Sequence, residues 1–439
     1  MKNIDLTQGK VLPVLTKLAL PIMGSSLLQF SYNLIDMLLV GRLGSDAVAS
    51  IGSSSLFISL GFSIHSFVAI GTGIKVSHSL GEKNENNVRK YINAGLFINL
   101  ILAVIYGLIL IFGGRGLIGF LNLNNFNVEN GGYYYLALHA PILFFNFFNI
   151  LFVRLLGSFG NNALAFRVNV VGIVMNTILD PIFIYGLGWG IIGAAMGTLV
   201  ANIVVFVLFL VLSKGMFSFR REYGLDIDKG KEIIRLGIPS TSQRVLFTII
   251  NIFLARIIAV FGSDAIAAQK IGLQIESVAF MVIGGFNGAV AAFTGQNYGA
   301  KEVKRVLEGY RGALKIGLIY SGFLTLVFLM FNEQIVRLFI QEENTVKIAS
   351  FYLTIIAFSQ VFSCIEMVSN GFFTGLGKPE ISSIISIVFT SLRLPMAMIF
   401  SRTYGLNGIW LSITLSSVLK GVSAFAMYQL HIKRSLRES

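Results

Sequence analysis

Residues 189–213 read WGIIGAAMGTLVANIVVFVLFLVLS, a stretch without a single charged side chain. A helix rises about 1.5 Å per residue, so a stretch of this length crosses the ~30 Å hydrocarbon core of a bilayer. Three further stretches, at 91–112, 316–331 and 380–401, are nearly free of charge. We therefore expect membrane-spanning helices, because transmembrane β-barrels show short alternating segments instead of continuous apolar runs.

The composition of the whole chain agrees with a membrane protein. Of the 439 residues, 55% are hydrophobic and only 13% are charged, about half the charged fraction of a typical soluble protein. This composition excludes a disordered chain and argues against a soluble enzyme. The net charge of +13 does not indicate nucleic-acid binding, because the basic residues lie in short loops between apolar runs. Cys364 is the only cysteine, which excludes a disulfide within the chain.

We predict an all-α polytopic membrane protein with twelve spans. Their approximate boundaries are 13–39, 47–74, 91–113, 131–156, 163–186, 189–213, 235–260, 265–293, 312–331, 348–372, 380–401 and 405–430. Residues 214–234 form the longest polar connection and predict a cytoplasmic linker between an N-terminal lobe (1–213) and a C-terminal lobe (235–439). Most of the 34 lysine and arginine residues lie in loops on the side of the N-terminus, which predicts that both termini are cytoplasmic in a plasma-membrane protein.

The two halves of the sequence repeat at a fixed offset of 218 residues. The matches are Leu20-Pro21 with Ile238-Pro239, GSDAVA at 44–49 with GSDAIA at 262–267, Gly81 with Gly299, and Gly157 with Gly375. Each half holds six spans and therefore begins on the same side of the membrane. The sequence thus predicts two pseudo-symmetric lobes, which is typical of transporters.

Four of the 21 acidic residues fall inside predicted spans, namely Asp36, Asp180, Glu276 and Glu366. A charged side chain inside the bilayer costs a few kcal/mol or more, so each of the four is a functional candidate. On span one, the spacing i, i+3, i+4, i+7 places four polar residues on one face: Gln29, Tyr32, Asn33 and Asp36.

Span five carries a second polar face that contains Asn176 and Asp180, and Pro181 follows directly. A proline there leaves a backbone carbonyl one turn earlier without its donor. Carboxylates, an amide and a free carbonyl are hard oxygen donors that suit H⁺ or Na⁺, and Thr198 on span six adds a hydroxyl. The alternative interpretation is that each aspartate pairs with a polar neighbour and only fixes helix packing.

The repeat assigns this acidic pair to the N-terminal half alone. Asp36 corresponds to Leu254, and Asp180 corresponds to Ala397 once a one-residue gap after Gly375 is allowed. A duplicated protein that keeps buried acids in one half suggests a specialised ion site there.

In the C-terminal half, Glu276 and Glu366 have two interpretations. Either could receive a cationic substrate, or each could form an ion pair with Lys270, Arg244, Arg256 or Arg393. The 12 methionines, Met281 among them, suit an adaptable apolar drug pocket but suit lipid-facing helices equally well. With Gln29, Asn33 and the two glutamates, Met281 completes the predicted substrate-binding set. Tyr133, Tyr134 and Tyr135 predict an aromatic belt at the outer membrane surface.

These motifs, taken in order, resemble the multidrug and toxic compound extrusion (MATE) transporters, in particular their DinF-like and MepA-like bacterial branch. The resemblance covers nearly the whole chain. It rests on Leu20-Pro21 with Asp36 and Gly41-Arg42-Leu43-Gly44, on Leu156-Gly157 through Asn176 and Asp180-Pro181, on Gln274-Ile275-Glu276-Ser277, on Gly295-Gln296-Asn297-Tyr298-Gly299-Ala300, and on Gly375-Leu376-Gly377-Lys378-Pro379.

The resemblance implies a V-shaped fold of two six-helix lobes and antiport by alternating access. H⁺ or Na⁺ enters while a drug-like, often cationic and amphipathic molecule leaves. It also implies a coupling-cation site in the N-terminal lobe, formed by Asp36, Asn176, Asp180 and Thr198, with Tyr32 beside it. The acids that another branch of the family uses in helices seven and ten are not matched well. We further hypothesise that helix one bends near Pro21 when the site changes occupancy.

Two other functions are alternatives to drug export, namely a flippase or polysaccharide exporter and a membrane enzyme. A lipid-linked oligosaccharide flippase or polysaccharide exporter of the same superfamily is the alternative, although twelve spans and the Asn176–Asp180 pair favour drug export. A membrane enzyme is not expected, because neither a His/Asp metal cluster nor a nucleophile triad is present in the sequence. We expect a monomer in contact with membrane lipids, without a cofactor other than the coupling ion. The choice between H⁺ and Na⁺ stays open.

Overall fold

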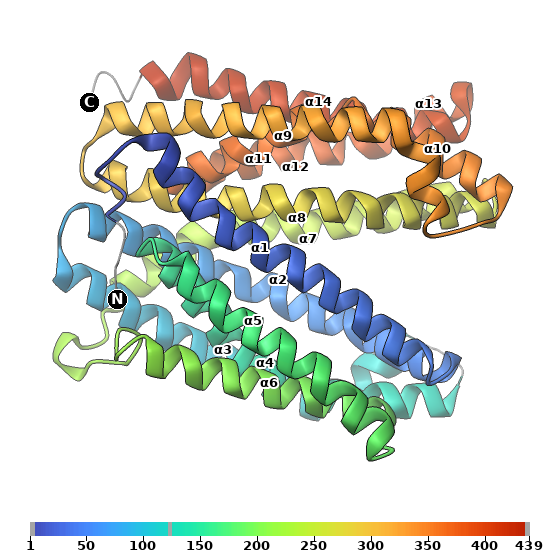
Figure 1. Cartoon of the computed structure of the whole chain (residues 1–439), viewed down its shortest axis with the longest axis horizontal. Coiled ribbons are helices and arrows are strands. Elements are labelled where there is room, and N and C mark those ends of the chain that lie inside the picture. Colours follow the sequence, from blue (N-terminus) through green and yellow to red (C-terminus); the bar gives the residue numbers. More distant parts are fainter. Residues whose placement is uncertain (1–4, 122–124, 435–439) are drawn as a thin grey trace. The chain divides into compact units, whose positions relative to one another are not determined.

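The computed structural model of the chain describes residues 5–121 and 125–434 (Figure 1). These residues are almost entirely helical and include no strand. Eleven helices are long and apolar enough to cross a membrane, and a pair bent by 55°, α10 (Glu343–Ala357) with α11 (Gln360–Gly375), makes up to twelve. The predicted all-α fold with twelve spans is confirmed. Residues 1–4 and 435–439, which carry the predicted cytoplasmic termini, lie outside the described residues.

The chain folds into two compact units. Unit 1 contains Gly24–Thr241, and unit 2 contains Leu6–Met23 together with the residues from Ser242 onward. Two helices, α1 (Val11–Gly41) and α7 (Ile227–Ala259), contribute to both units. Unit 1 also holds α2 (Ser45–Gly81), α3 (Glu85–Phe120), α4 (Phe126–Ser158), α5 (Asn162–Pro181), the π-helical turn η1 (Ile182–Gly186), α6 (Gly190–Leu212) and the 3-10 turn η2 (Arg221–Tyr223).

Unit 2 holds the remaining helices. Besides α10 and α11 these are α8 (Ser263–Gly299), α9 (Val303–Arg337), α12 (Pro379–Ser391), α13 (Arg393–Tyr404), α14 (Leu406–Met427) and the π-helical turn η3 (Tyr428–Ile432). Each unit is built around one central helix. In unit 1, α4 packs against α2, α3, α5 and α6, and in unit 2, α11 packs against α8, α9, α12 and α14.

The backbone repeats as the sequence does. Helices α2 and α8 both have 37 residues. Each is preceded by a glycine with positive φ, Gly44 at 100° and Gly262 at 99°, a conformation that glycine adopts without steric cost. Each is followed by a lysine with positive φ, Lys83 at 56° and Lys301 at 60°. Two chain segments 218 residues apart thus share unusual backbone angles at both ends of a long helix.

Helices α1 and α7 change unit at equivalent positions. Helix α1 passes from unit 2 to unit 1 after Met23, and α7 passes from unit 1 to unit 2 after Thr241. Each carries a proline two residues before the change, Pro21 in α1 and Pro239 in α7. A proline inside a helix removes one backbone hydrogen bond, so these are the positions where each helix bends most readily.

Unit 1 holds the beginning of α7 by close backbone packing and by one asparagine. Asn93 of α3 donates to the backbone carbonyls of Arg220 (2.8 Å) and Gly224 (3.0 Å), and its Oδ1 accepts from the Arg220 N–H (3.1 Å). A Cβ at Gly237 of α7 would overlap the main chain of Phe67 in α2. The predicted linker 214–234 therefore packs on unit 1 and includes the first turns of α7. The lobe boundaries at 213 and 235 stay a proposal.

Unit 2 holds the segment before α1 through an arginine. The Arg305 guanidinium donates to the carbonyl oxygens of Leu6 (3.1 Å), Gln8 (3.1 Å) and Gly9 (2.6 Å). Its Nε donates to Asn297 Oδ1 (3.0 Å), and Asn297 Nδ2 donates to Leu6 O (3.1 Å). Leu6 is fully buried beneath this cluster. The beginning of α1 is thereby fixed to unit 2.

Arg305→Gln removes several charge-assisted hydrogen bonds at once. We expect the free energy of unfolding of the purified protein to fall by at least about 2 kcal/mol, which is the contribution of a single hydrogen bond to a charged group. The reason is that the segment before α1 is no longer held by Arg305. Thermal unfolding in detergent measures the effect. Arg311→Gln changes an exposed arginine on the same helix and serves as the control. Equal melting temperatures for the two variants would contradict this role of Arg305.

Candidate functional site

The polar residues of spans one and five meet inside unit 1. Asn176 Nδ2 of α5 donates to the Tyr32 hydroxyl of α1 (2.6 Å). Asp180 lies one helical turn after Asn176 and is fully buried. Neither carboxylate oxygen of Asp180 has a hydrogen bond of normal geometry among the described residues, and Asn176 Oδ1 also lacks one. Three buried oxygen acceptors therefore lie within one turn of α5, and the donor group that interacts with Asp180 is the Tyr32 hydroxyl.

Asp36 and Thr198 belong to the same site. Tyr32 lies within electrostatic range of both Asp36 and Asp180, and its hydroxyl also interacts with the side chain of Thr198 on α6. Asp36 is half-buried, and the described residues include no ion-pair partner for it or for Asp180. The structure thus brings all five residues of the predicted cation site together. Among the described residues, neither acid has a nearby base that could neutralise it.

Glycines of α6 make room for the Asp180 carboxylate. A Cβ at Gly197 would overlap Asp180 Oδ1, and a Cβ at Gly193 would lie 2.6 Å from the main-chain carbonyl of Phe183. Small residues four apart let two helices approach closely in a membrane. Gly197 is not among the predicted site residues, although the Gly193-x-x-x-Gly197 spacing in residues 189–213 is typical of closely packed membrane helices.

Tyr135 of α4 does not lie where its sequence context predicts. We expected it in an exposed aromatic belt, but its side chain is only 8% exposed. It lies within electrostatic range of both Asp36 and Asp180. Tyr135 therefore forms part of the wall of the site. At the end of α5, the hydroxyl of Tyr185 in η1 donates to the Leu39 carbonyl of α1 (2.5 Å) and ties the two elements together.

The two glutamates of unit 2 have partners of their own. Glu276 of α8 is buried and accepts hydrogen bonds from Tyr352 (3.1 Å) and Gln360 (3.5 Å). Glu366 of α11 forms an ion pair with Lys420 of α14 (2.9 Å) and accepts a hydrogen bond from Ser386 (3.0 Å). Within unit 2, both acids are therefore held by polar or basic neighbours.

The other predicted substrate residues lie on α1 and α8. Gln29 and Asn33 are exposed on α1, where Gln29 Nε2 donates to Asn33 Oδ1 (3.1 Å). Met281 is half-buried on α8. Their part in substrate binding stays a proposal.

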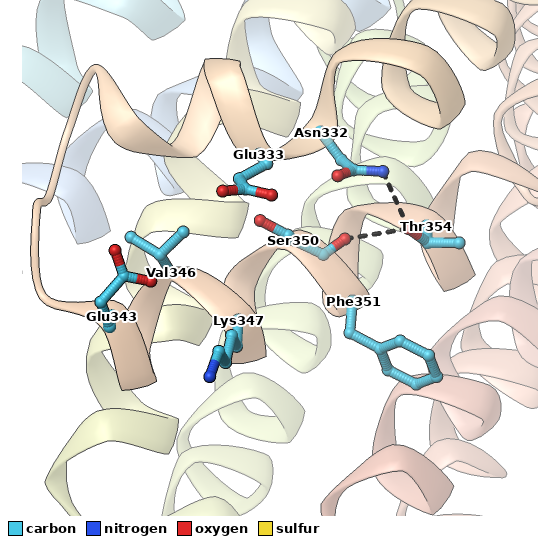
Figure 2. A pocket seen from close by; sticks show the side chains of 8 residues that line it. All are labelled: Asn332, Glu333, Glu343, Val346, Lys347, Ser350, Phe351 and Thr354. Atoms are coloured by element: carbon cyan, nitrogen blue, oxygen red, sulfur yellow. Dashed lines mark hydrogen bonds between the residues drawn. The ribbon is translucent and has the colours of Figure 1, made fainter.

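A separate pocket of about 290 Å³ lies at the end of α9 and beside α10 (Figure 2). Asn332 donates to the Thr354 hydroxyl (3.2 Å), which donates in turn to the Ser350 carbonyl (3.0 Å). Its two glutamates, Glu333 and Glu343, are both ion-paired with Arg337. None of the predicted site residues lines this pocket, which is lined by Asn332, Glu333, Glu343, Val346, Lys347, Ser350, Phe351 and Thr354.

Comparison with known proteins points to one family. The family model described as MatE matches the chain twice, over residues 21–182 and 239–399. The probable multidrug resistance protein YpnP of Bacillus subtilis (strain 168) is 27% identical over 433 residues, which cover 98% of this chain and 97% of YpnP. The multidrug export protein MepA of Staphylococcus aureus (strain NCTC 8325 / PS 47) is 23% identical, with 96% and 94% of the two chains covered.

A solved structure has the same fold. The crystal structure of MATE in complex with MaL6 superposes with a TM-score of 0.94 at 23% sequence identity and covers 100% of both chains. The two matches to the MatE model begin at Pro21 and Pro239, the prolines that the sequence repeat also pairs.

Gly197→Ala tests how tightly α6 encloses the acid. The added Cβ overlaps Asp180 Oδ1, so we expect a loss of about 1–3 kcal/mol, the usual cost of overpacking. In an Asp180→Ala background the oxygen is absent, and the same substitution should cost much less. Gly52→Ala is the control, because its Cβ would meet nothing within 4 Å. Thermal unfolding of the four variants measures the coupling, and an equal cost of Gly197→Ala in both backgrounds would contradict the contact.

Proposed function

Because the chain belongs to the MatE family, we propose that it is a cation-coupled multidrug antiporter of the plasma membrane, with both termini in the cytoplasm. Relatives that carry the names multidrug resistance protein and multidrug export protein support drug export. The eleven to twelve candidate spans support a membrane-embedded transporter. The substrate class that we propose is drug-like organic molecules, often cationic and amphipathic.

One observation carries the coupling proposal, namely the Asp180 carboxylate. It is fully buried, and neither oxygen has a hydrogen bond of normal geometry. The side chain that interacts with it is the Tyr32 hydroxyl, and no base pairs with it among the described residues. A buried charge left without a partner is strongly unfavourable in a protein or a bilayer. Binding of a cation that neutralises the carboxylate therefore stabilises the site.

The donor set fits a small monovalent cation. A proton would bind directly to a carboxylate oxygen of Asp180 or Asp36. Na⁺ would find hard oxygen ligands in the Asp180 carboxylate and Asn176 Oδ1, both without a hydrogen bond of normal geometry, with the Thr198 hydroxyl and the Tyr32 hydroxyl at the same site. Both ions suit these ligands, so the proposal covers H⁺ and Na⁺.

Coupling follows from electrostatics. Without the cation, Asp36 and Asp180 repel each other and attract positive charge, including the charge of a cationic substrate. With the cation bound, that attraction is lost and the substrate dissociates more readily. A ligand moves a conformational equilibrium only as far as it binds one state better than the other. We propose that the loaded and unloaded site favour different packing of the second half of α1, which carries Tyr32 and Asp36, and that α1 bends near Pro21.

The test is efflux of ethidium from proteoliposomes, with a pH gradient and a Na⁺ gradient imposed in separate experiments. Asp36→Asn and Asp180→Asn keep the side-chain size and remove the charge. We expect each to slow gradient-driven efflux at least about tenfold, because the site loses 1.4 kcal/mol or more of ion interaction.

Asp228→Asn is the matched control, since this aspartate is 83% exposed and pairs only with Lys231 among the described residues. It should transport like the unmodified protein. Efflux that neither gradient drives would refute antiport. Unimpaired efflux in both aspartate variants, at equal amounts of inserted protein, would refute the assignment of the ion site.

A further inference from the structure

Three positions of the cation site carry apolar side chains in unit 2. Tyr32 and Asp36 of α1 correspond by the 218-residue repeat to Ile250 and Leu254 of α7. Both are buried and belong to one apolar core cluster. Asp180 corresponds to Ala397, which is fully buried in the same cluster. Unit 2 therefore has no acid at the positions where unit 1 has two.

Arginine replaces asparagine at the fourth equivalent position. Asn176 lies fourteen residues after the start of α5 at Asn162, and Arg393 lies fourteen residues after the start of α12 at Pro379. Arg393 is only 6% exposed. Its Nε donates to the Ser416 hydroxyl (2.5 Å) and its Nη2 donates to the Ser417 hydroxyl (3.2 Å), both on α14.

Arg393 lies within electrostatic range of Glu276 and Glu366. Lys420, one turn after Ser416 on α14, is 7% exposed and forms the ion pair with Glu366. These four residues, Glu276, Glu366, Arg393 and Lys420, form a charge cluster in unit 2 with two acids and two bases. Its net charge is zero, whereas the described site of unit 1 holds two acids and no base.

We propose that Arg393 is a fixed counter-cation, which does permanently in unit 2 what an exchangeable cation does in unit 1. This proposal rests on the proposed function and concerns the number of ions involved. A neutral cluster gains nothing from an additional monovalent cation, and the arginine side chain cannot leave. The chain therefore has one exchangeable cation site, in unit 1. Glu276 does not take part in coupling, because Tyr352 and Gln360 donate to it and Arg393 lies within electrostatic range of it.

The proposal predicts that unit 2 acquires a second cation site when the guanidinium is removed. Arg393→Asn installs the residue that unit 1 has at the equivalent position and removes the base that lies within electrostatic range of the Glu276 carboxylate. The measurement is the melting temperature of the purified protein against Na⁺ concentration at fixed pH, and against pH at fixed Na⁺, with choline chloride holding the ionic strength constant. Cation binding to the folded protein raises the melting temperature by mass action.

We expect the melting temperature of Arg393→Asn to rise about twice as steeply with one of the two cations as that of the unmodified protein, because two cations instead of one stabilise the fold. The double variant Glu276→Gln/Arg393→Asn should return to the original slope. Arg393→Lys keeps the positive charge and should also keep the original slope. Arg402→Asn changes an exposed arginine at the end of α13 and is the control.

Two results would overturn the proposal. In the first, folded Arg393→Asn has the cation dependence of the unmodified protein. In the second, neither Arg393→Asn nor the double variant folds. That result would mean that Arg393 stabilises the fold through its hydrogen bonds to Ser416 and Ser417 and not by neutralising Glu276. Folding of the double variant alone would support the proposal. Absence of any cation dependence in the unmodified protein would instead count against the proposed function.

Discussion

The organisation of unit 1 depends on one unsatisfied charge. Asp180 places a carboxylate in a fully buried position where neither oxygen has a hydrogen bond of normal geometry and, among the described residues, no base lies nearby. Such a group is tolerated only if something neutralises it. The surrounding residues fit that requirement: Gly197 leaves space for the carboxylate, and Asn176 orients the Tyr32 hydroxyl beside it. A site that is stable only when loaded is what an ion-driven transporter requires, because the energy of loading is then available to drive a conformational change.

The duplicated fold uses two different solutions to the problem of buried charge. Unit 1 leaves two acids without a base, whereas unit 2 pairs two acids with Arg393 and Lys420 and fills the equivalent of the cation site with Ile250, Leu254 and Ala397. The ends of α2 and α8 share their backbone angles, as the positive φ angles of Gly44 and Gly262 show, whereas the continuous α4 corresponds to the bent pair α10 and α11. The buried charges are therefore arranged differently in two halves that descend from one repeat.

Much of the fold and of the candidate site could be predicted from the sequence, because both depend on periodic patterns along single helices. Uninterrupted apolar runs predict the spans, and the spacing of Tyr32, Asp36, Asn176 and Asp180 predicts two polar faces that the structure brings together. What escaped prediction depends on contacts between helices. The ion pair of Glu366 with Lys420, the burial of Tyr135 and the space left by Gly197 require knowledge of which helices are neighbours and at what depth. The hydrogen bonds from Arg305 to the carbonyls of Leu6, Gln8 and Gly9 could not be predicted either, because every residue has a backbone carbonyl and no sequence pattern indicates which of them accept.

The central claim, that the carboxylates of unit 1 exchange a cation for substrate, can be measured directly on purified protein. Ethidium is added to the protein in weakly buffered solution, while a pH indicator follows released protons and a sodium electrode follows released Na⁺. Competition for one site predicts that about one cation, H⁺ or Na⁺, leaves for each ethidium bound, and that replacing Asp180 by Asn abolishes the release. Binding of ethidium at full occupancy without release of either cation would contradict the claim.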